Sequence, residues 1–303
     1  GRSPPGGRLV LAAGEYPEPL VLTKGIEVVG RCPSRVRLTG VTALASGDRA
    51  TVFVSKTTGA VLRRLGIGGD GMGIGVENGG GLLVERVWIH GAQGRGIRAN
   101  GAGTVVTVRD SLVEDTRFLE DGTKGFGAAA GMGAEMLVTG SALLRNRSTG
   151  VYVLDAGTAF DLSDSLVEGT LPVGDIGGMA LMATLGAHAA LEGNAIVANH
   201  NAGISISSAG TKATLTRNLV EGTLAVGGAG YGVFVSEGAT STCVGNVVAK
   251  STNTGIFVRD SGTSSALRGN LVRDTNPGTD ATSLNRGFGL RVRSGAGVRF
   301  EDN

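Results

Sequence analysis

The hydrophobic and polar positions of this chain follow a recurring pattern of short apolar runs separated by turns. The run Leu166-Val167-Glu168 returns as Leu219-Val220-Glu221, and related runs begin at Leu112 and Leu271. The leading leucines of these four runs are 54, 53 and 52 residues apart. Self-similarity at a nearly fixed period is typical of repeat architectures.

Weaker members of the same set lie between these copies and begin at Trp88, Leu143, Ile196 and Val247. Steps of 23 to 24 residues alternate with steps of 28 to 31 residues along the ordered set, so the repeat is a pair of one short and one long unit.

Each short unit contains three short strands, for example Leu143-Leu144, Gly150–Val153 and Phe160–Leu162. Alternation within each strand places one face inside and one outside. Three strands in roughly 23 residues fit one turn of a parallel β-helix, with turns stacked at about 4.8 Å. The pattern therefore predicts an all-β chain, a single right-handed parallel β-helix of about eleven coils in which short and long coils alternate.

The first 40 residues carry a more specific motif. Gly14-x-Tyr16-x-Glu18 is followed by a strand, by Lys24-Gly25, by another strand and by Gly30. This order resembles the entry coils of right-handed parallel β-helix proteins of the pectin-lyase-like superfamily. Such proteins usually carry a capping helix before this segment, and the chain ends within a coil. We therefore expect residues 1–303 to be one β-helix domain that is a segment of a longer chain.

Composition supports a folded β-rich chain and excludes several other classes. The chain has 54 glycines and 7 prolines, a hydrophobic fraction of 41% and a net charge of +2. This charge is too small to suggest a nucleic-acid surface, and no apolar run approaches the roughly 20 residues of a membrane span. The cysteines Cys32 and Cys243 form neither a metal set nor a disulfide framework. A β-propeller with blades of about 50 residues is the rival fold, and it would need antiparallel strands within each blade.

Stacking converts matching sequence positions into columns. Asn218, Asn246, Asn270 and Asn303, with Ser111 and Ser165 in earlier coils, predict a ladder in which each amide bonds to the next coil. We interpret a second column as turn residues, with an ice-binding row of hydroxyls as the weaker alternative. The members of this column are Thr116, Arg147, Thr170, His200, Thr223, Ser251 and Thr275. A third column indicates surface ion pairs, with an acidic row for calcium or a sugar as the alternative; its members are Glu114, Arg145, Glu168, Ala198, Glu221, Ala249 and Arg273.

The long coils differ from the short coils by an insert at one corner. Insertions confined to one face of a solenoid often mark its binding surface, although a loop without a partner is equally compatible with the pattern. The loop-face candidates for binding a protein or a glycan are Asp121, Lys124, Asp175, Asp280 and Arg286. The coil ends offer a second place for continuation or self-association.

We find no sequence pattern for catalysis, for a metal site or for a cofactor. Paired carboxylates that could act as acid and base in glycoside cleavage are not evident, and His90, His188 and His200 look isolated. An aromatic fraction of 4% is thin for a sugar-stacking cleft.

The leading functional hypothesis is a non-catalytic β-helix that is extracellular or at the cell surface and serves as a rod, adhesin or assembly component. A polysaccharide lyase or glycoside hydrolase with its site among the long-coil loops is the alternative. A periplasmic carbohydrate-binding module is a third possibility. Turnover of a polysaccharide by the purified protein would separate the second hypothesis from the others.

Overall fold

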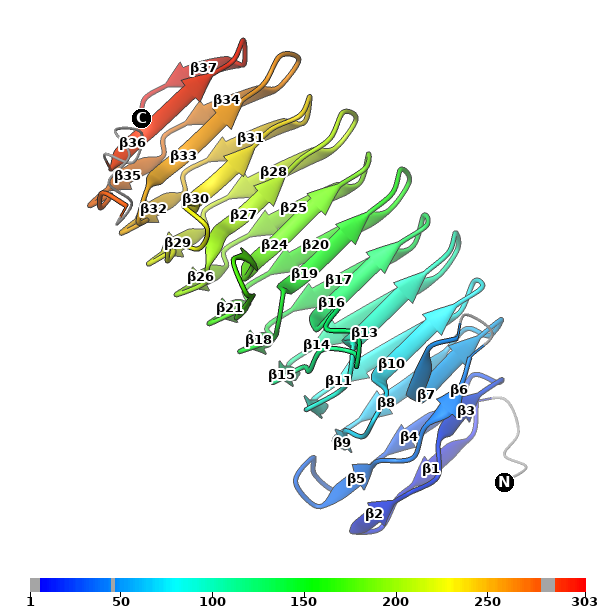
Figure 1. The fold of residues 1–303 in the computed structure, drawn as a ribbon. Coiled ribbons are helices and arrows are strands. Elements are labelled where there is room, and N and C mark those ends of the chain that lie inside the picture. Colours follow the sequence, from blue (N-terminus) through cyan, green and yellow to red (C-terminus); the bar gives the residue numbers. More distant parts are fainter. Residues whose placement is uncertain (1–5, 45–46, 279–286) are drawn as a thin grey trace.

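The computed structural model describes residues 6–44, 47–278 and 287–303, and these form a right-handed parallel β-helix with its two chain ends at opposite ends of the solenoid (Figure 1). The predicted fold is confirmed, because strands in successive coils pair in parallel and each coil contributes one strand to each of three sheets. A propeller is excluded, since its blades need antiparallel neighbours.

The three sheets run the full length of the solenoid. Sheet A contains, in order, β1 (Arg8–Val10), β4 (Glu27–Val29), β8 (Ala60–Arg63), β11 (Gly81–Glu85), β14 (Val105–Arg109), β17 (Glu135–Thr139), β20 (Ala159–Ser163), β25 (His188–Glu192), β28 (Lys212–Thr216), β31 (Thr240–Val244), β34 (Ser264–Arg268) and β37 (Gly297–Glu301). Sheet B contains β2 (Gly14–Tyr16), β5 (Val36–Leu38), β9 (Gly66–Ile67), β12 (Trp88–His90), β15 (Leu112–Glu114), β18 (Ala142–Leu144), β21 (Leu166–Glu168), β26 (Ala195–Val197), β29 (Leu219–Glu221), β32 (Val247–Ala249) and β35 (Leu271–Arg273). Sheet C contains β3 (Leu20–Leu22), β7 (Arg49–Ser55), β10 (Met72–Glu77), β13 (Arg95–Asn100), β16 (Phe126–Gly131), β19 (Thr149–Leu154), β24 (Met179–Thr184), β27 (Asn201–Ile206), β30 (Gly230–Val235), β33 (Thr254–Arg259) and β36 (Phe288–Arg293).

Two short antiparallel pairs accompany the three parallel sheets. The strand β6 (Thr42–Ala43) pairs antiparallel with β7, and β22 (Pro172–Val173) pairs antiparallel with β23 (Ile176–Gly177). The second hairpin is one of the long-coil inserts. In the described residues, no helix is long and apolar enough to cross a membrane.

Inward-facing aliphatic side chains fill the solenoid. From β12 to β29, the middle residue of each sheet B strand points inward, as in the buried column Ile89, Val113, Leu143, Val167 and Ile196. Both neighbours of each middle residue are more exposed, which is the period-2 alternation that the sequence predicts.

This register corrects the predicted alignment in two short coils. Leu112 lies opposite Ala142, and Leu166 lies opposite Ala195. The anchors placed at Leu143 and Ile196 were therefore wrong by one residue. Ala142-Leu143-Leu144 is apolar throughout, so its pattern does not show that the middle residue is the inward one.

The predicted amide ladder is confirmed and is longer than expected. It runs through Ser111, Ser141, Ser165, Asn194, Asn218, Asn246, Asn270 and Asn303 at the turn from sheet A to sheet B. From Asn218 onward, each amide oxygen accepts hydrogen bonds from both the backbone N–H and the side-chain amide of the asparagine in the preceding coil. The ladder thus satisfies buried polar groups that the turn would otherwise leave without partners.

A second buried ladder lies at the turn from sheet B to sheet C, and it replaces the predicted threonine column. The amide oxygens of Asn146 and Asn199 accept hydrogen bonds from the backbone N–H groups of Thr116 and Thr170. Thr116 is 1% exposed. A row this deeply buried excludes the ice-binding alternative. Arg147 and His200 follow the ladder asparagines and are not members of it.

Candidate functional site

The inserts of the long coils form a wall along the corner between sheets B and C, as predicted. The described inserts comprise 115–125, 169–178 and 222–229, whereas the insert after β35 includes residues 279–286, which the structure does not describe. The wall continues across the short coils, because Gln93 bridges to Arg117, Arg147 to Leu171 and His200 to Leu224. An added Cβ on Gly227 would come within 2.6 Å of the carbonyl oxygen of Asp175. Inserts from alternate coils therefore touch one another over the short coil between them.

Among the predicted loop-face residues, the three that the structure describes do not converge on one point. The Asp121 carboxylate accepts hydrogen bonds from the backbone N–H and the hydroxyl of Thr123, and these bonds lower the pKa of Asp121. Asp175 lies in the turn of the β22–β23 hairpin. Asp280 and Arg286 fall outside the described residues, so the structure says nothing of these two candidates.

Lys124 joins the wall to the outer face of sheet C. Its Nζ lies 3.0 Å from Oδ1 of Asp48, which also pairs with Arg95 and Arg98, and Arg98 in turn binds Glu77. Burial acts to raise the pKa of Asp48, but the hydrogen bond from Lys124 and the nearby arginine charges outweigh it and hold this pKa below its ordinary value. The cluster fastens the β6–β7 hairpin to sheet C.

The Asp48 cluster predicts a pH dependence of stability. Because the pKa of Asp48 is lower in the folded state than in the unfolded state, its stabilising contribution is fully present above the unfolded value of about 4 and is lost as pH falls through the folded value. We expect the free energy of unfolding to fall more steeply below about pH 4 in the wild type than in Asp48→Asn. Urea unfolding at a series of pH values measures both slopes. Equal slopes would contradict the assignment.

The outer face of sheet C gathers aromatic side chains that the sequence reading undervalued. The rings of Phe126 and Tyr152 lie 4.8 Å apart, and Tyr231, Phe234 and Phe257 form a cluster with centroid separations of 5.1 to 5.5 Å. Arg259 lies over the ring of Phe234, and Arg291 lies over that of Phe257. A low overall aromatic fraction is thus compatible with a locally aromatic face.

One row of this face follows the period of the inserts. In each long coil, the residue near the start of the sheet C strand, directly after the insert, is bulky: Phe126, Met179, Tyr231 and Phe288. The short coils between carry Thr149, Ala202 and Thr254 in this column. We call the four bulky residues the long-coil row. Its members are half-buried or exposed, and their repeat of two coils corresponds to about 10 Å.

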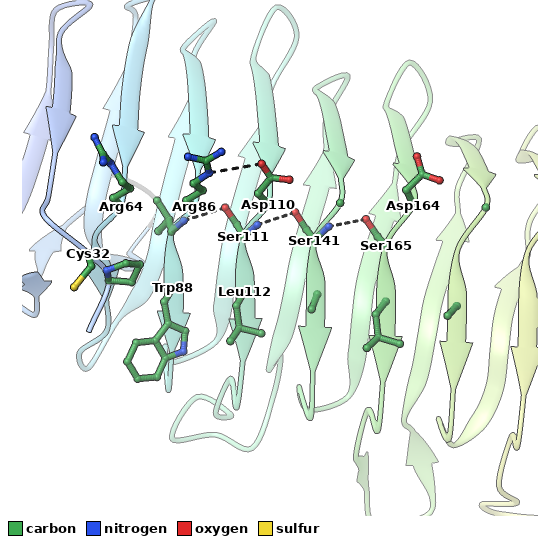
Figure 2. A pocket seen from close by; sticks show the side chains of 17 residues that line it. Cys32, Arg64, Arg86, Trp88, Asp110, Ser111, Leu112, Ser141, Asp164 and Ser165 are labelled. Atoms are coloured by element: carbon green, nitrogen blue, oxygen red, sulfur yellow. Dashed lines mark hydrogen bonds and ion pairs between the residues drawn. The ribbon is translucent and has the colours of Figure 1, made fainter. Parts of the chain in front are cut away.

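A trough of about 910 Å³ lies over the junction of sheets A and B (Figure 2). Its floor is the outward side of sheet B, with Trp88, Leu112 and Leu166. The serine part of the ladder runs along it, and Figure 2 shows Ser111, Ser141 and Ser165 in successive coils. Arg86 and Asp110 form a long ion pair of 3.9 Å on its rim.

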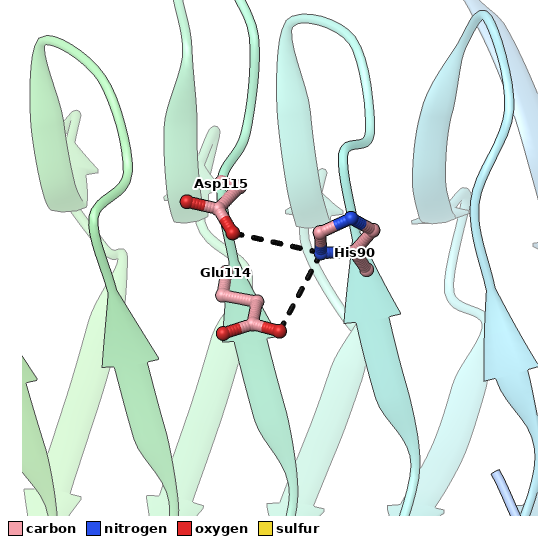
Figure 3. A group of neighbouring side chains, drawn as sticks. All are labelled: His90, Glu114 and Asp115. Atoms are coloured by element: carbon pink, nitrogen blue, oxygen red, sulfur yellow. Dashed lines mark ion pairs between the residues drawn. The ribbon is translucent and has the colours of Figure 1, made fainter. Parts of the chain in front are cut away.

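A smaller pocket of about 470 Å³ lies at the corner where sheet B ends, and its lining includes His90, Asp115, Arg145, Arg37 and Arg147. Figure 3 shows His90, Glu114 and Asp115 facing one another from adjacent coils. His90 is therefore not isolated, contrary to the sequence reading, because 24 residues of sequence correspond to one coil of the solenoid.

The two carboxylates of this corner accept hydrogen bonds from Arg145 and Trp88. Arg145 binds Oε2 of Glu114 at 2.6 Å and both oxygens of Asp115 at 3.0 Å, and Trp88 Nε1 donates to Oε1 of Glu114 at 2.8 Å. The bond from Arg145 to Glu114 is an ion pair of the kind predicted for the third column, whereas Glu221 pairs with Lys250, which is not a member of that column. The pairs are diagonal, since Glu114 lies directly opposite Leu144 and not Arg145.

Both cysteines are free, as predicted. Burial raises the pKa of the Cys243 thiol to about 11, and Cys32 lies in the loop at one end of the trough.

Comparison with known proteins identifies the fold in solved structures of low sequence identity. A crystal structure of DFA-IIIase from Arthrobacter chlorophenolicus A6 matches with a TM-score of 0.64 and 11% identity, over 98% of this chain and 85% of that one. The Agl-KA catalytic domain matches with a TM-score of 0.55 and 12% identity, over 96% of this chain and 62% of that one. The A-module of the mannuronan C-5 epimerase AlgE6 from Azotobacter vinelandii matches with a TM-score of 0.51 and 15% identity, over 97% of this chain and 89% of that one.

A search of curated proteins found no match to the sequence. The family model for the right-handed β-helix region matches residues 50–220 and 173–272, which together span most of the chain. With the parallel sheets and the asparagine ladder, this match confirms the resemblance to the pectin-lyase-like β-helices: the chain belongs to the right-handed β-helix family.

Proposed function

We propose that this protein is a non-catalytic carbohydrate-binding β-helix that acts at the cell surface or outside the cell. A glycan chain would lie along the outer face of sheet C, beside the wall of inserts. The observation that carries the proposal is the long-coil row, in which Phe126, Met179, Tyr231 and Phe288 repeat directly after successive inserts.

Half-exposed aromatic rings suit a sugar, because an aromatic face packs against the apolar C–H face of a pyranose while the sugar hydroxyls stay in water. The coil spacing of about 4.8 Å is comparable to the length of one monosaccharide unit, so a two-coil repeat would contact every second sugar of an extended chain. The arginines beside the rings, Arg259 and Arg291, add donors at the same face.

The structural neighbours support the carbohydrate class of ligand only by analogy of fold. They include a DFA-IIIase and a mannuronan C-5 epimerase. The non-catalytic part of the proposal is supported by the corner carboxylates, since Arg145 binds both Glu114 and Asp115 and ties them into one ion-pair network.

The test is calorimetric binding to a panel of neutral and acidic polysaccharides, with release of reducing ends and of unsaturated products followed in the same samples. We expect at least one glycan to bind without being cleaved, and Tyr231→Ala to weaken that binding about tenfold, the scale of one lost ring contact of about 1.4 kcal/mol. Val105→Ala is the matched control, because Val105 is exposed on sheet A and its truncation also removes apolar surface.

Equal affinities of Tyr231→Ala and the wild type would place binding elsewhere than on sheet C. Cleavage of a bound polysaccharide would contradict the non-catalytic reading and favour the alternative, a polysaccharide lyase or glycoside hydrolase.

A further inference from the structure

We propose that His90, Glu114 and Asp115 form a binding site for a divalent transition-metal ion, with Zn²⁺ as the best-fitting ion. The sequence reading expected no metal, and nothing in the glycan proposal requires one. The site lies at the corner pocket, where β12 and β15 end on neighbouring coils (Figure 3).

The spacing of the three ligand atoms matches a small ion. Nδ1 of His90 lies 3.4 Å from Oε1 of Glu114 and 3.6 Å from Oδ2 of Asp115. A tetrahedral zinc ion with bonds of 2.0–2.2 Å to nitrogen and oxygen holds its ligand atoms roughly 3.4 Å apart. All three atoms lie within 4.8 Å of one another, so an ion placed between them would reach each after a small movement of the side chains.

Each of the three atoms can also offer an electron pair to an ion, Nδ1 of His90 in the tautomer that carries its proton on Nε2. Nδ1 of His90 is buried and has no hydrogen-bond partner among the described residues. Oε1 of Glu114 accepts one hydrogen bond from Trp88, and Oδ2 of Asp115 accepts one from Arg145. A carboxylate oxygen can accept two hydrogen bonds, so each oxygen keeps one lone pair on the side that faces His90.

His200 is a histidine of the same corner between sheets B and C, three positions further along its coil than the column of His90. Its Nδ1 lies 2.8 Å from the carbonyl oxygen of Thr170, so that the nitrogen has a partner within the protein. The unsatisfied Nδ1 of His90 is thus a property of its own site and not of the corner in general.

The surroundings resemble the outer layer of a metal site. Arg145 and Trp88 donate hydrogen bonds to the carboxylates and so fix their orientation, as the hydrogen-bonding partners of metal-bound carboxylates do. Glu114, Asp115 and Arg145 together carry a charge of −1 beside His90, and the other arginines of the pocket, Arg37, Arg117 and Arg147, add positive charge around them. The remaining coordination position would open into the pocket that Arg37 and Arg147 line, and neither of these arginines has a carboxylate partner among the described residues. Their charges suit water, hydroxide or a carboxylate as the fourth ligand of the ion.

The experiment uses tag-free protein, stripped with a chelator and titrated with Zn²⁺ and separately with Co²⁺ and Mn²⁺. Calorimetry measures affinity, and the visible absorption of bound Co²⁺ reports its coordination geometry. Trp88 is the single tryptophan of the chain, its ring lies 5.1 Å from that of His90, and its fluorescence should change on binding. We expect one Zn²⁺ per chain, and an affinity at least tenfold weaker in His90→Gln and in Asp115→Asn.

His188→Gln is the matched control, because His188 lies exposed at the start of β25 on sheet A and its loss should leave binding unchanged. Circular dichroism of each variant establishes that it is folded. The proposal is overturned if the wild type binds none of the three ions, or if folded His90→Gln binds as tightly as the wild type. It is also overturned if NMR shows His90 protonated against the two carboxylates at neutral pH with Zn²⁺ in excess.

Discussion

Replacing Phe160 by alanine is expected to lower the free energy of unfolding by about 3–5 kcal/mol. Phe160 is one of the largest side chains that are fully buried, at 1% exposure. It lies inside sheet A, and the next two coils of its column carry only Ala189 and Ala213. Few neighbouring side chains of that column are long enough to collapse into the space that the ring would leave, so the cavity term stays large.

Denaturant unfolding followed by circular dichroism measures this loss. Phe160→Leu is the control, since it keeps an apolar side chain of intermediate size and should lose less than half as much stability. If the alanine and leucine variants unfolded at the same denaturant concentration, the ring would not be filling the space assigned to it.

Replacing Asn218 by leucine is expected to destabilise the solenoid by about 3–5 kcal/mol, because it leaves several buried polar groups without partners. The Asn218 side chain accepts hydrogen bonds from the backbone and side-chain amides of Asn194 and donates to Asn246 and to the carbonyl of Leu191. Leucine has a similar volume but no polar atom, so the cost comes from polarity and not from packing.

Asn218→Ser separates these two causes. Serine occupies the same ladder at Ser111, Ser141 and Ser165, where its hydroxyl accepts from the backbone N–H of the preceding coil. We expect the serine variant to lose about half as much stability as the leucine variant, as measured by urea unfolding. A leucine variant as stable as the serine variant would show that the ladder contributes little.

The architecture was predictable because identical letters return in the long coils. The period follows from the repeated runs Leu166-Val167-Glu168 and Leu219-Val220-Glu221. The ladder follows from asparagines that stand directly before such runs, for example Asn218 and Asn270. The register of the short coils was harder to predict, because Ala142, Leu143 and Leu144 are all apolar and only burial shows which one points inward.

The candidate sites were less visible in the sequence for a physical reason. His90 and Glu114 are 24 residues apart, and only the exact register of the coils brings their side chains together. Similarly, Phe126 and Tyr231 look like scattered aromatics until the inserts that precede them are seen to lie along one corner. A search for bulky residues directly after each insert would have found the long-coil row without coordinates.

The contact between Asp175 and Gly227 has a consequence for how such a chain can change in length. Loss of one short coil would bring two long-coil inserts into adjacent coils, where they would overlap. Removal or duplication of one short and one long coil together, about 53 residues, would keep the spacing of the inserts unchanged. Viable length variants in nature or in the laboratory should therefore differ by multiples of this double unit.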